Sequence, residues 1–283
     1  PHGNNMSFAA EYIAQLERYA ARSVLPRVRA LHLPPKPIPA TDNTGECCAL
    51  ELEDGALGLS YVLLGETLER LRAQRDGYGL AGADALALAR RYAQEEGTAR
   101  NQGFAAANAL TRCFFDRAAY VPEASADSIG QLDPQAGERI GMIGLFPPLV
   151  EPILKAGAEL MVVELKTALA GDRERYRITL DASELASCSK VVSTSTLLLN
   201  DTLDAMLAHC RQARWFAMVG PGAGCLPDAL FARGVTLVGG SWVHDREGFL
   251  DALCRGDSTS RCTRKFAIAA AGYPGFERLL ARL

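Results

Sequence analysis

The chain has 283 residues, of which 48% are hydrophobic and 22% are charged, and its formal net charge is −3. These values are ordinary for a globular protein with one large or two ordinary domains. The absence of a basic block argues against nucleic acid or an acidic membrane surface as a partner. No apolar run approaches the roughly 20 residues that span a bilayer, so we expect no membrane partner.

Compartment and redox state follow from the start of the chain and from its cysteines. Pro1 to Asn5 are interpreted as an expression leftover that precedes a native Met6, and the residues after Met6 do not form a signal peptide. We therefore expect a cytoplasmic protein. The eight cysteines lie mostly in apolar or helical contexts, which predicts free buried thiols rather than disulfides.

Hydrophobic periodicity in the first half predicts both helices and strands. The expected helices cover 7–29, 82–94 and 100–115, and the expected strands cover 47–52 and 58–63, with a proline-rich connector over 31–39. The helix over 100–115 has a face of glycine and alanine, which allows close packing and could serve a homodimer. This half is predicted to be α+β.

The pattern changes in the second half, where strands alternate with helices. Residues 122–138 lack periodicity and are the expected linker between a domain over 7–121 and a domain over 139–283. The expected strands cover 139–145, 159–164, 190–195, 215–219 and 235–239, and the expected helices cover 148–156, 182–187, 201–211, 226–233 and 245–255. This alternation predicts an α/β domain with a parallel sheet.

Loops of small and polar residues follow three of the predicted strands. Since ligands bind at the carboxyl edge of a parallel sheet, these loops predict a small-molecule pocket. Glycines there would let consecutive N–H groups meet an anionic oxygen, and hydroxyls could contact the ligand. The expected ligand-binding residues in these loops are Thr194, Ser195, Thr196, Asn200, Gly220, Pro221, Gly222, Gly240 and Ser241.

A nucleotide site has weaker support. The first loop after the linker reads G-x-x-G followed by two prolines, which argues against a conventional dinucleotide fingerprint, and no P-loop motif is present. Glu164, at the end of the second predicted strand of this half, could still accept hydrogen bonds from a ribose hydroxyl. A nucleoside-type ligand is therefore kept as an alternative.

Cys225 and His244 are the candidate reactive or metal-binding side chains. Cys225 precedes a predicted helix, where the helix dipole would favour the thiolate. His244 ends the last of the three loops, and the two residues could bind a metal together if their loops converge. The sequence contains no C-x-x-C, H-x-x-x-H or H-E-x-x-H motif, so it predicts no strong zinc site.

Several of these segments resemble a bacterial and archaeal family known as "putative heavy-metal chelation". They are 141–150, 194–202, 219–221 with 226–231, and 239–241, while 48–55 and 101–110 resemble the smaller domain that precedes them in that family. The resemblance implies a C-terminal Rossmann-like domain after a domain similar to the N-terminal domain of enolase. It also implies binding of a metal or metal complex. The family commonly has glycine at the position of Asp201.

Three functions remain open from the sequence. The first is binding or handling of a transition metal, a metal chelate or a small anionic ligand in a cleft between the two domains. The second is an enzyme that uses a nucleoside-containing cofactor such as S-adenosylmethionine on a small-molecule substrate, with Cys225 or His244 as the reacting group. The third is an assembly role without a working pocket.

Overall fold

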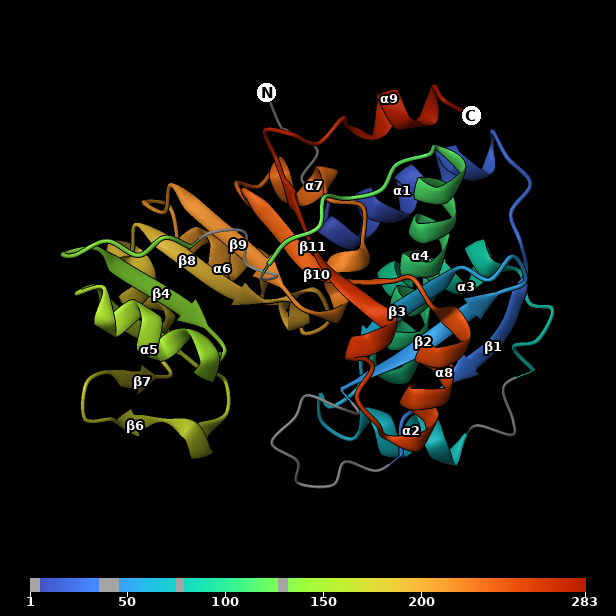
Figure 1. The fold of residues 1–283 in the computed structure, drawn as a ribbon. Coiled ribbons are helices and arrows are strands. Elements are labelled where there is room, and N and C mark those ends of the chain that lie inside the picture. Colours follow the sequence, from blue (N-terminus) through green and yellow to red (C-terminus); the bar gives the residue numbers. More distant parts are fainter. Residues whose placement is uncertain (1–5, 36–45, 75–78, 127–131) are drawn as a thin grey trace.

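A three-stranded antiparallel sheet and an eight-stranded, mostly parallel sheet organise the computed structural model of the chain (Figure 1). The structure describes residues 6–35, 46–74, 79–126 and 132–283. In Figure 1 the small sheet and its helices lie on one side, and the large sheet extends away from them to its β6–β7 end.

The first part of the chain builds the small sheet and covers it with helices. Its strands pair in the order β1-β2-β3, and its elements are α1 (Phe8–Ala20), β1 (Val28–His32), β2 (Cys47–Leu52), β3 (Leu57–Tyr61), α2 (Thr67–Ala73), α3 (Ala85–Gln94) and α4 (Gly97–Arg117). Ser7 and Asp84 cap α1 and α3 by accepting hydrogen bonds from backbone N–H groups of their first turns.

Helix α4 lies directly against β3, and a glycine allows this contact. A Cβ atom at Gly58 would lie 2.0 Å from the carbonyl oxygen of Ala105 and 2.1 Å from the amide nitrogen of Ala109. Only a residue without a side chain fits such a close approach of two backbones. Asn101 and Asn108 of α4 then donate to carbonyl oxygens of β3, which fixes the helix along the strand.

The large sheet has the strand order β11-β10-β9-β8-β4-β5-β7-β6. The six inner strands run parallel, whereas β11 and β6 pair antiparallel at the two edges. The strands are β4 (Arg139–Ile143), β5 (Glu159–Val163), β6 (Gly171–Asp172), β7 (Arg177–Thr179), β8 (Lys190–Thr194), β9 (Trp215–Val219), β10 (Leu237–Val243) and β11 (Thr263–Ala269).

Short helices connect these strands, and a last helix follows β11. The α-helices are α5 (Pro147–Lys155), α6 (Leu203–His209), α7 (Asp228–Phe231), α8 (Arg246–Arg255) and α9 (Phe276–Leu280), and the 3₁₀ helices are η2 (Thr167–Leu169), η3 (Ala182–Ser187), η4 (Ser195–Leu198), η5 (Pro221–Gly224) and η6 (Ser260–Cys262). Helix α5 covers one face of the large sheet with a separate apolar cluster that includes Ile153 and Val162.

The two parts share one apolar core. A single cluster of buried side chains runs from Tyr12, Tyr92 and Phe104 in the first part to Met218 and Phe266 in the second. Helix α1 is also joined to the second part near both of its ends. Glu11 pairs with Arg233 close to α7, and Arg18 pairs with Glu277 of α9.

The predicted fold class is confirmed, because a smaller α+β part precedes an α/β part with a mostly parallel sheet. The helix predicted over 7–29 ends at Ala20, and part of the predicted connector forms strand β1. The segment 182–187 is a 3₁₀ helix rather than an α-helix. Residues 36–39 of the connector and 127–131 of the linker lie outside the described residues, and the domain boundaries stay a prediction.

The cysteines are free, as predicted, and five of the eight are buried. Cys254 is exposed, whereas Cys47 and Cys262 are half-buried. Among the helices that the structure describes, none combines the length and apolar character needed to cross a bilayer.

Candidate functional site

The loops that follow the parallel strands lie together along one edge of the large sheet. The amide of Gly144 donates to Val163 (2.8 Å), which joins the ends of β4 and β5. The amide of Gly220 donates to Gly239 (3.1 Å), which joins the loop after β9 to β10. The amide of Gly222 donates to the Ser195 hydroxyl at 3.1 Å, so the loops after β8 and β9 also meet.

The glycine-rich loop after β9 is packed inside the molecule. Gly222 is buried, and a Cβ atom there would lie 3.0 Å from the Phe104 ring of α4. A Cβ atom at Gly220 would lie 2.4 Å from the Ser195 hydroxyl oxygen, and Pro221 begins the short helix η5. Gly220 therefore permits close packing against Ser195, and Gly222 permits close packing against α4 of the first part. The amide of Gly222 is already bonded to Ser195, and the predicted binding of an anion by this loop stays a prediction.

Cys225 and His244 lie in different surroundings. Cys225 has no exposed surface, and burial raises the pKa of its thiol to about 12. The predicted thiolate is therefore wrong, because desolvation outweighs any helix dipole at this position. His244 is exposed, and its backbone amide donates to the carbonyl oxygen of Cys262. Their pairing as metal ligands stays a prediction.

The polar residues after β8 mostly satisfy their own loop. Thr194 accepts a hydrogen bond from the Thr196 amide at 3.3 Å, and Asn200 accepts one from the Thr202 amide at 3.3 Å. These bonds are local caps of the kind that threonine and asparagine form at turns. The side-chain nitrogen of Asn200 is buried without a hydrogen-bond partner among the described residues.

Glu164 links two loops at the same edge. Its carboxylate accepts hydrogen bonds from the amides of Leu145 (3.2 Å) and Leu165 (3.0 Å). The pKa of the Tyr61 phenol at the end of β3 is raised, first by burial and then by the charges of Glu46 and Glu164. Glu164 thus joins the loop after β4 to the end of β5, and its proposed contact with a ribose stays a prediction.

Gly240 and Ser241 belong to strand β10 itself. Gly240 is buried, and a Cβ atom there would lie 3.2 Å from the carbonyl oxygen of Gly220 and 3.2 Å from the Phe266 ring. Ser241 is exposed and pairs with Lys265 of β11. The strand therefore continues beyond the expected loop, because β11 supplies an antiparallel partner that the sequence did not predict.

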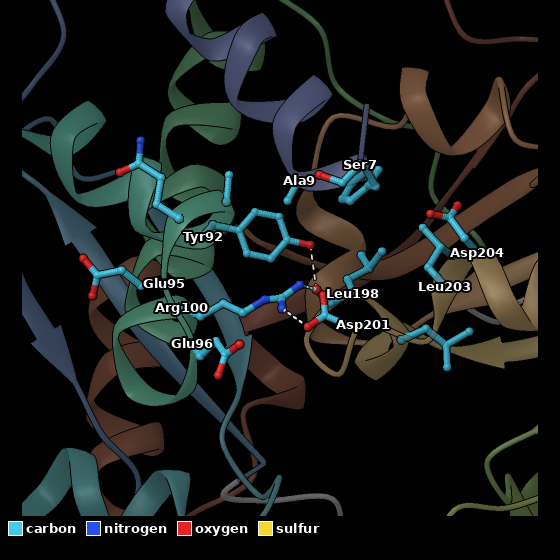
Figure 2. Close-up of a pocket in the computed structure, with 14 residues that line it drawn as sticks. Ser7, Ala9, Tyr92, Glu95, Glu96, Arg100, Leu198, Asp201, Leu203 and Asp204 are labelled. Carbon is cyan, nitrogen blue, oxygen red and sulfur yellow. Dashed lines mark hydrogen bonds and ion pairs between the residues drawn. The ribbon is translucent and has the colours of Figure 1, made fainter. Parts of the chain in front are cut away.

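A hollow with a volume of about 280 Å³ lies where the loop after β8 meets the helices of the first part (Figure 2). It is lined by residues 7–9 at the start of α1, residues 92–96 at the end of α3, Arg100 in α4, and five residues between Leu197 and Asp204. This volume is close to the lower end of the roughly 300–1,000 Å³ found for ligand sites in proteins. We refer to it below as the hollow.

Arg100 is the central side chain of the hollow. It extends from α4 toward the loop after β8 and pairs with Asp201, as Figure 2 shows. Its guanidinium lies 5.3 Å from the centre of the Tyr92 ring, and the Tyr92 hydroxyl donates to the carbonyl oxygen of Leu198 at 2.6 Å. Residues from three separate segments thus hold one another in place.

The lining is acidic around this single cation. Glu95, Glu96, Asp201 and Asp204 contribute four carboxylates, and Arg100 contributes the one guanidinium. Asp204 also pairs with Arg233 at 3.3 Å, outside the lining. Among the described residues, no cation pairs with Glu95 or Glu96, so these two exposed carboxylates add unpaired negative charge to the lining.

Sequence reasoning did not find the residues of the hollow. Arg100 and Asp201 are 101 positions apart, so no local pattern joins them. Asp201 has a φ of +58°, which is rare for a residue with a side chain and which glycine adopts easily. This backbone conformation accounts physically for the glycine that the family resemblance implies at the position.

The comparisons with known proteins establish the family. The model of the DUF364 family, described as "Putative heavy-metal chelation", matches residues 127–271, which is just over half of the chain. The chain therefore belongs to this family. It is also 29% identical over 152 residues to the uncharacterized protein MJ0500 of Methanocaldococcus jannaschii, a match that covers 52% of this chain and 55% of the relative.

Two solved structures of DUF364 proteins with unknown function share the fold. The protein from Desulfitobacterium hafniense is 20% identical with a TM-score of 0.67, and the protein from Pyrococcus horikoshii is 23% identical with a TM-score of 0.66. Each comparison covers 93% of this chain and 100% of the other. The curated relative is matched over only about half of its length, so these likenesses establish family and fold and do not identify a ligand.

Proposed function

We propose that the chain binds a small metal chelate, that is, a metal ion already held by an organic ligand, in the hollow between its two parts. The observation that carries this proposal is the charge composition of the lining, which combines one largely buried guanidinium with four carboxylates, of which Asp201 pairs with it. A ligand that carries both a metal cation and anionic groups complements such a lining better than a simple anion does.

A bare metal ion fits the described residues less well. The part of the chain that the structure describes contains no group of three or more His, Cys, Asp and Glu side chains placed to hold a metal ion. Since metal ions in proteins commonly take four or more ligands, a metal bound in the hollow would keep the ligands of its chelator. Glu95 and Glu96 would then interact with the metal cation of the complex rather than with its net charge.

Isothermal titration calorimetry of the full chain tests this proposal. The probes are Ni²⁺ alone, citrate alone and preformed Ni²⁺–citrate, each at low salt because exposed charges are screened by salt. We expect measurable binding of Ni²⁺–citrate and weaker binding of either component. Absence of Ni²⁺–citrate binding, with the chain folded, would overturn the proposal whether or not a single component binds.

A matched pair of variants locates the site. The double variant Glu95→Gln, Glu96→Gln removes two exposed carboxylates from the lining of the hollow and is expected to weaken binding of the complex about tenfold. The control variant Glu66→Gln, Glu69→Gln removes two exposed carboxylates from the region of α2 and is expected to leave the affinity unchanged. Equal loss in both variants would show that the charge effect is not specific to the hollow.

A further inference from the structure

We propose that Asp201 masks Arg100, and that the bound ligand displaces Asp201 with a carboxylate or phosphate oxygen of its own. This inference rests on the proposed function, because it concerns the same hollow and names the anionic group of the ligand. It assigns Arg100 as the residue that anchors this group and Asp201 as the residue that sets the affinity for it.

Arg100 lines the hollow, and some N–H groups of its guanidinium have no hydrogen-bond acceptor among the described residues. Its side chain is 12% exposed and pairs with Asp201 through one terminal nitrogen. The other terminal nitrogen makes a long contact of 3.5 Å with the carbonyl oxygen of Leu198, and Nε is buried without a partner among the described residues. A guanidinium has five N–H groups in a planar fork that matches a carboxylate or phosphate. Arg100 therefore keeps donor capacity for a better-matched anion.

Asp201 is poorly placed to be a permanent partner. Its side chain is 70% exposed, so water screens its attraction to Arg100. Its backbone has a φ of +58°, which an aspartate adopts only at some cost. Rotation of this exposed side chain into solvent would free the guanidinium without moving the backbone of the loop.

The remaining contacts of Arg100 hold it in position when Asp201 leaves. The Tyr92 ring lies against the guanidinium, and the Tyr92 hydroxyl is itself bonded to Leu198. Tyr92 is buried in the shared core, so it forms a rigid support. An anion that reached Arg100 would meet a preorganised donor, while the cationic part of the same ligand would lie toward Glu95 and Glu96.

Three variants of the full chain and one control variant test the mask, with calorimetry as the readout. Asp201→Asn keeps the size of the side chain and removes its charge, and Asp201→Gly also suits the positive φ. We expect both variants to bind free citrate roughly fivefold more tightly than the native chain does. Arg100→Gln is expected to abolish this binding, and Asp251→Asn, an exposed aspartate on α8, is expected to leave it unchanged.

The outcomes separate the mask from the proposed function. Equal affinity of the native chain and of both Asp201 variants for citrate and for inorganic phosphate would overturn the mask, even if Ni²⁺–citrate binds. Tighter citrate binding by the Asp201 variants, without any binding of Ni²⁺–citrate, would support the mask and overturn the chelate proposal. Inorganic phosphate serves as a separate probe. If only phosphate gains affinity in Asp201→Asn, the mask stands, and a chelator carboxylate is excluded as the displacing group.

Discussion

Cys225 offers the sharpest test of how the glycine-rich loop is used. Its thiol is fully buried in the core that the two parts share, and its pKa is raised to about 12 by burial, so at neutral pH it is a protonated, apolar-like side chain. Cys225→Ser would bury a hydroxyl in this apolar core, which costs about 1–3 kcal/mol. Cys225→Ala adds no polar group and is expected to destabilise the chain less.

The expected loss is large enough to measure by thermal unfolding. About 1 kcal/mol shifts the melting temperature of a chain of this size by about 2–4 °C, so a cost of about 1–3 kcal/mol in Cys225→Ser should lower it by about 2–12 °C. Cys254→Ser is the matched control, because Cys254 is exposed and surface substitutions usually stay within about 0.5 kcal/mol. If Cys225→Ser abolished Ni²⁺–citrate binding at an unchanged melting temperature, the thiol would have to contact the ligand, and our interpretation of the loop would be refuted.

Two further predictions concern buried or loop-bound carboxylates. Burial alone would raise the pKa of Glu51, but hydrogen bonds from His32 (2.8 Å) and Arg246 (2.6 Å) outweigh it and hold the pKa below its ordinary value. The ionised Glu51 carboxylate therefore stabilises the fold at neutral pH, and this stabilisation is lost as the pH falls below about 4. Urea unfolding should give Glu51→Gln a lower free energy of unfolding than the native chain at pH 7. Between pH 5 and about 3 the free energy of unfolding of this variant should fall less than that of the native chain. An equal fall in both proteins would contradict this assignment. Glu164→Ala should lower stability by about 1–2 kcal/mol because the Leu145 amide loses its acceptor. A thermal shift with S-adenosylmethionine that this variant abolishes would instead favour the enzyme alternative.

The elements with strong periodicity could be predicted from the sequence, and those that depend on distant partners could not. Strand β2 and five of the inner strands of the large sheet, β4, β5, β8, β9 and β10, follow from short apolar runs, whereas the three-residue inner strand β7 was not predicted. Strands β1 and β11 are different, because each is an edge strand that carries several polar or charged residues and is stabilised by antiparallel pairing with a neighbour. Edge strands lack the continuous apolar character of buried parallel strands, so their patterns are weak.

The loops after β8 and β9 follow the strands that the sequence predicted, whereas the third expected loop is part of strand β10, and what the glycines contact could not be inferred from sequence. A glycine allows either close approach of a ligand or close packing of the protein, and composition does not separate the two. At Gly222 the decisive neighbour is the Phe104 ring, which comes from a helix more than a hundred positions earlier. Arg100 and Asp201 were missed for the same reason, since only the folded chain brings them together.

The attachment of helix α1 near both ends has a kinetic consequence for the hollow. Residues at the start of α1 line the hollow. The Glu11–Arg233 and Arg18–Glu277 pairs fix this helix to the second part, and its buried face belongs to the shared core. A hinge motion of helix α1 would break these pairs and expose the core to water. Exchange of a ligand would then depend on rotamer changes of exposed side chains such as Asp201, which occur within nanoseconds. Association should therefore proceed without a slow conformational gate, at a rate limited by encounter.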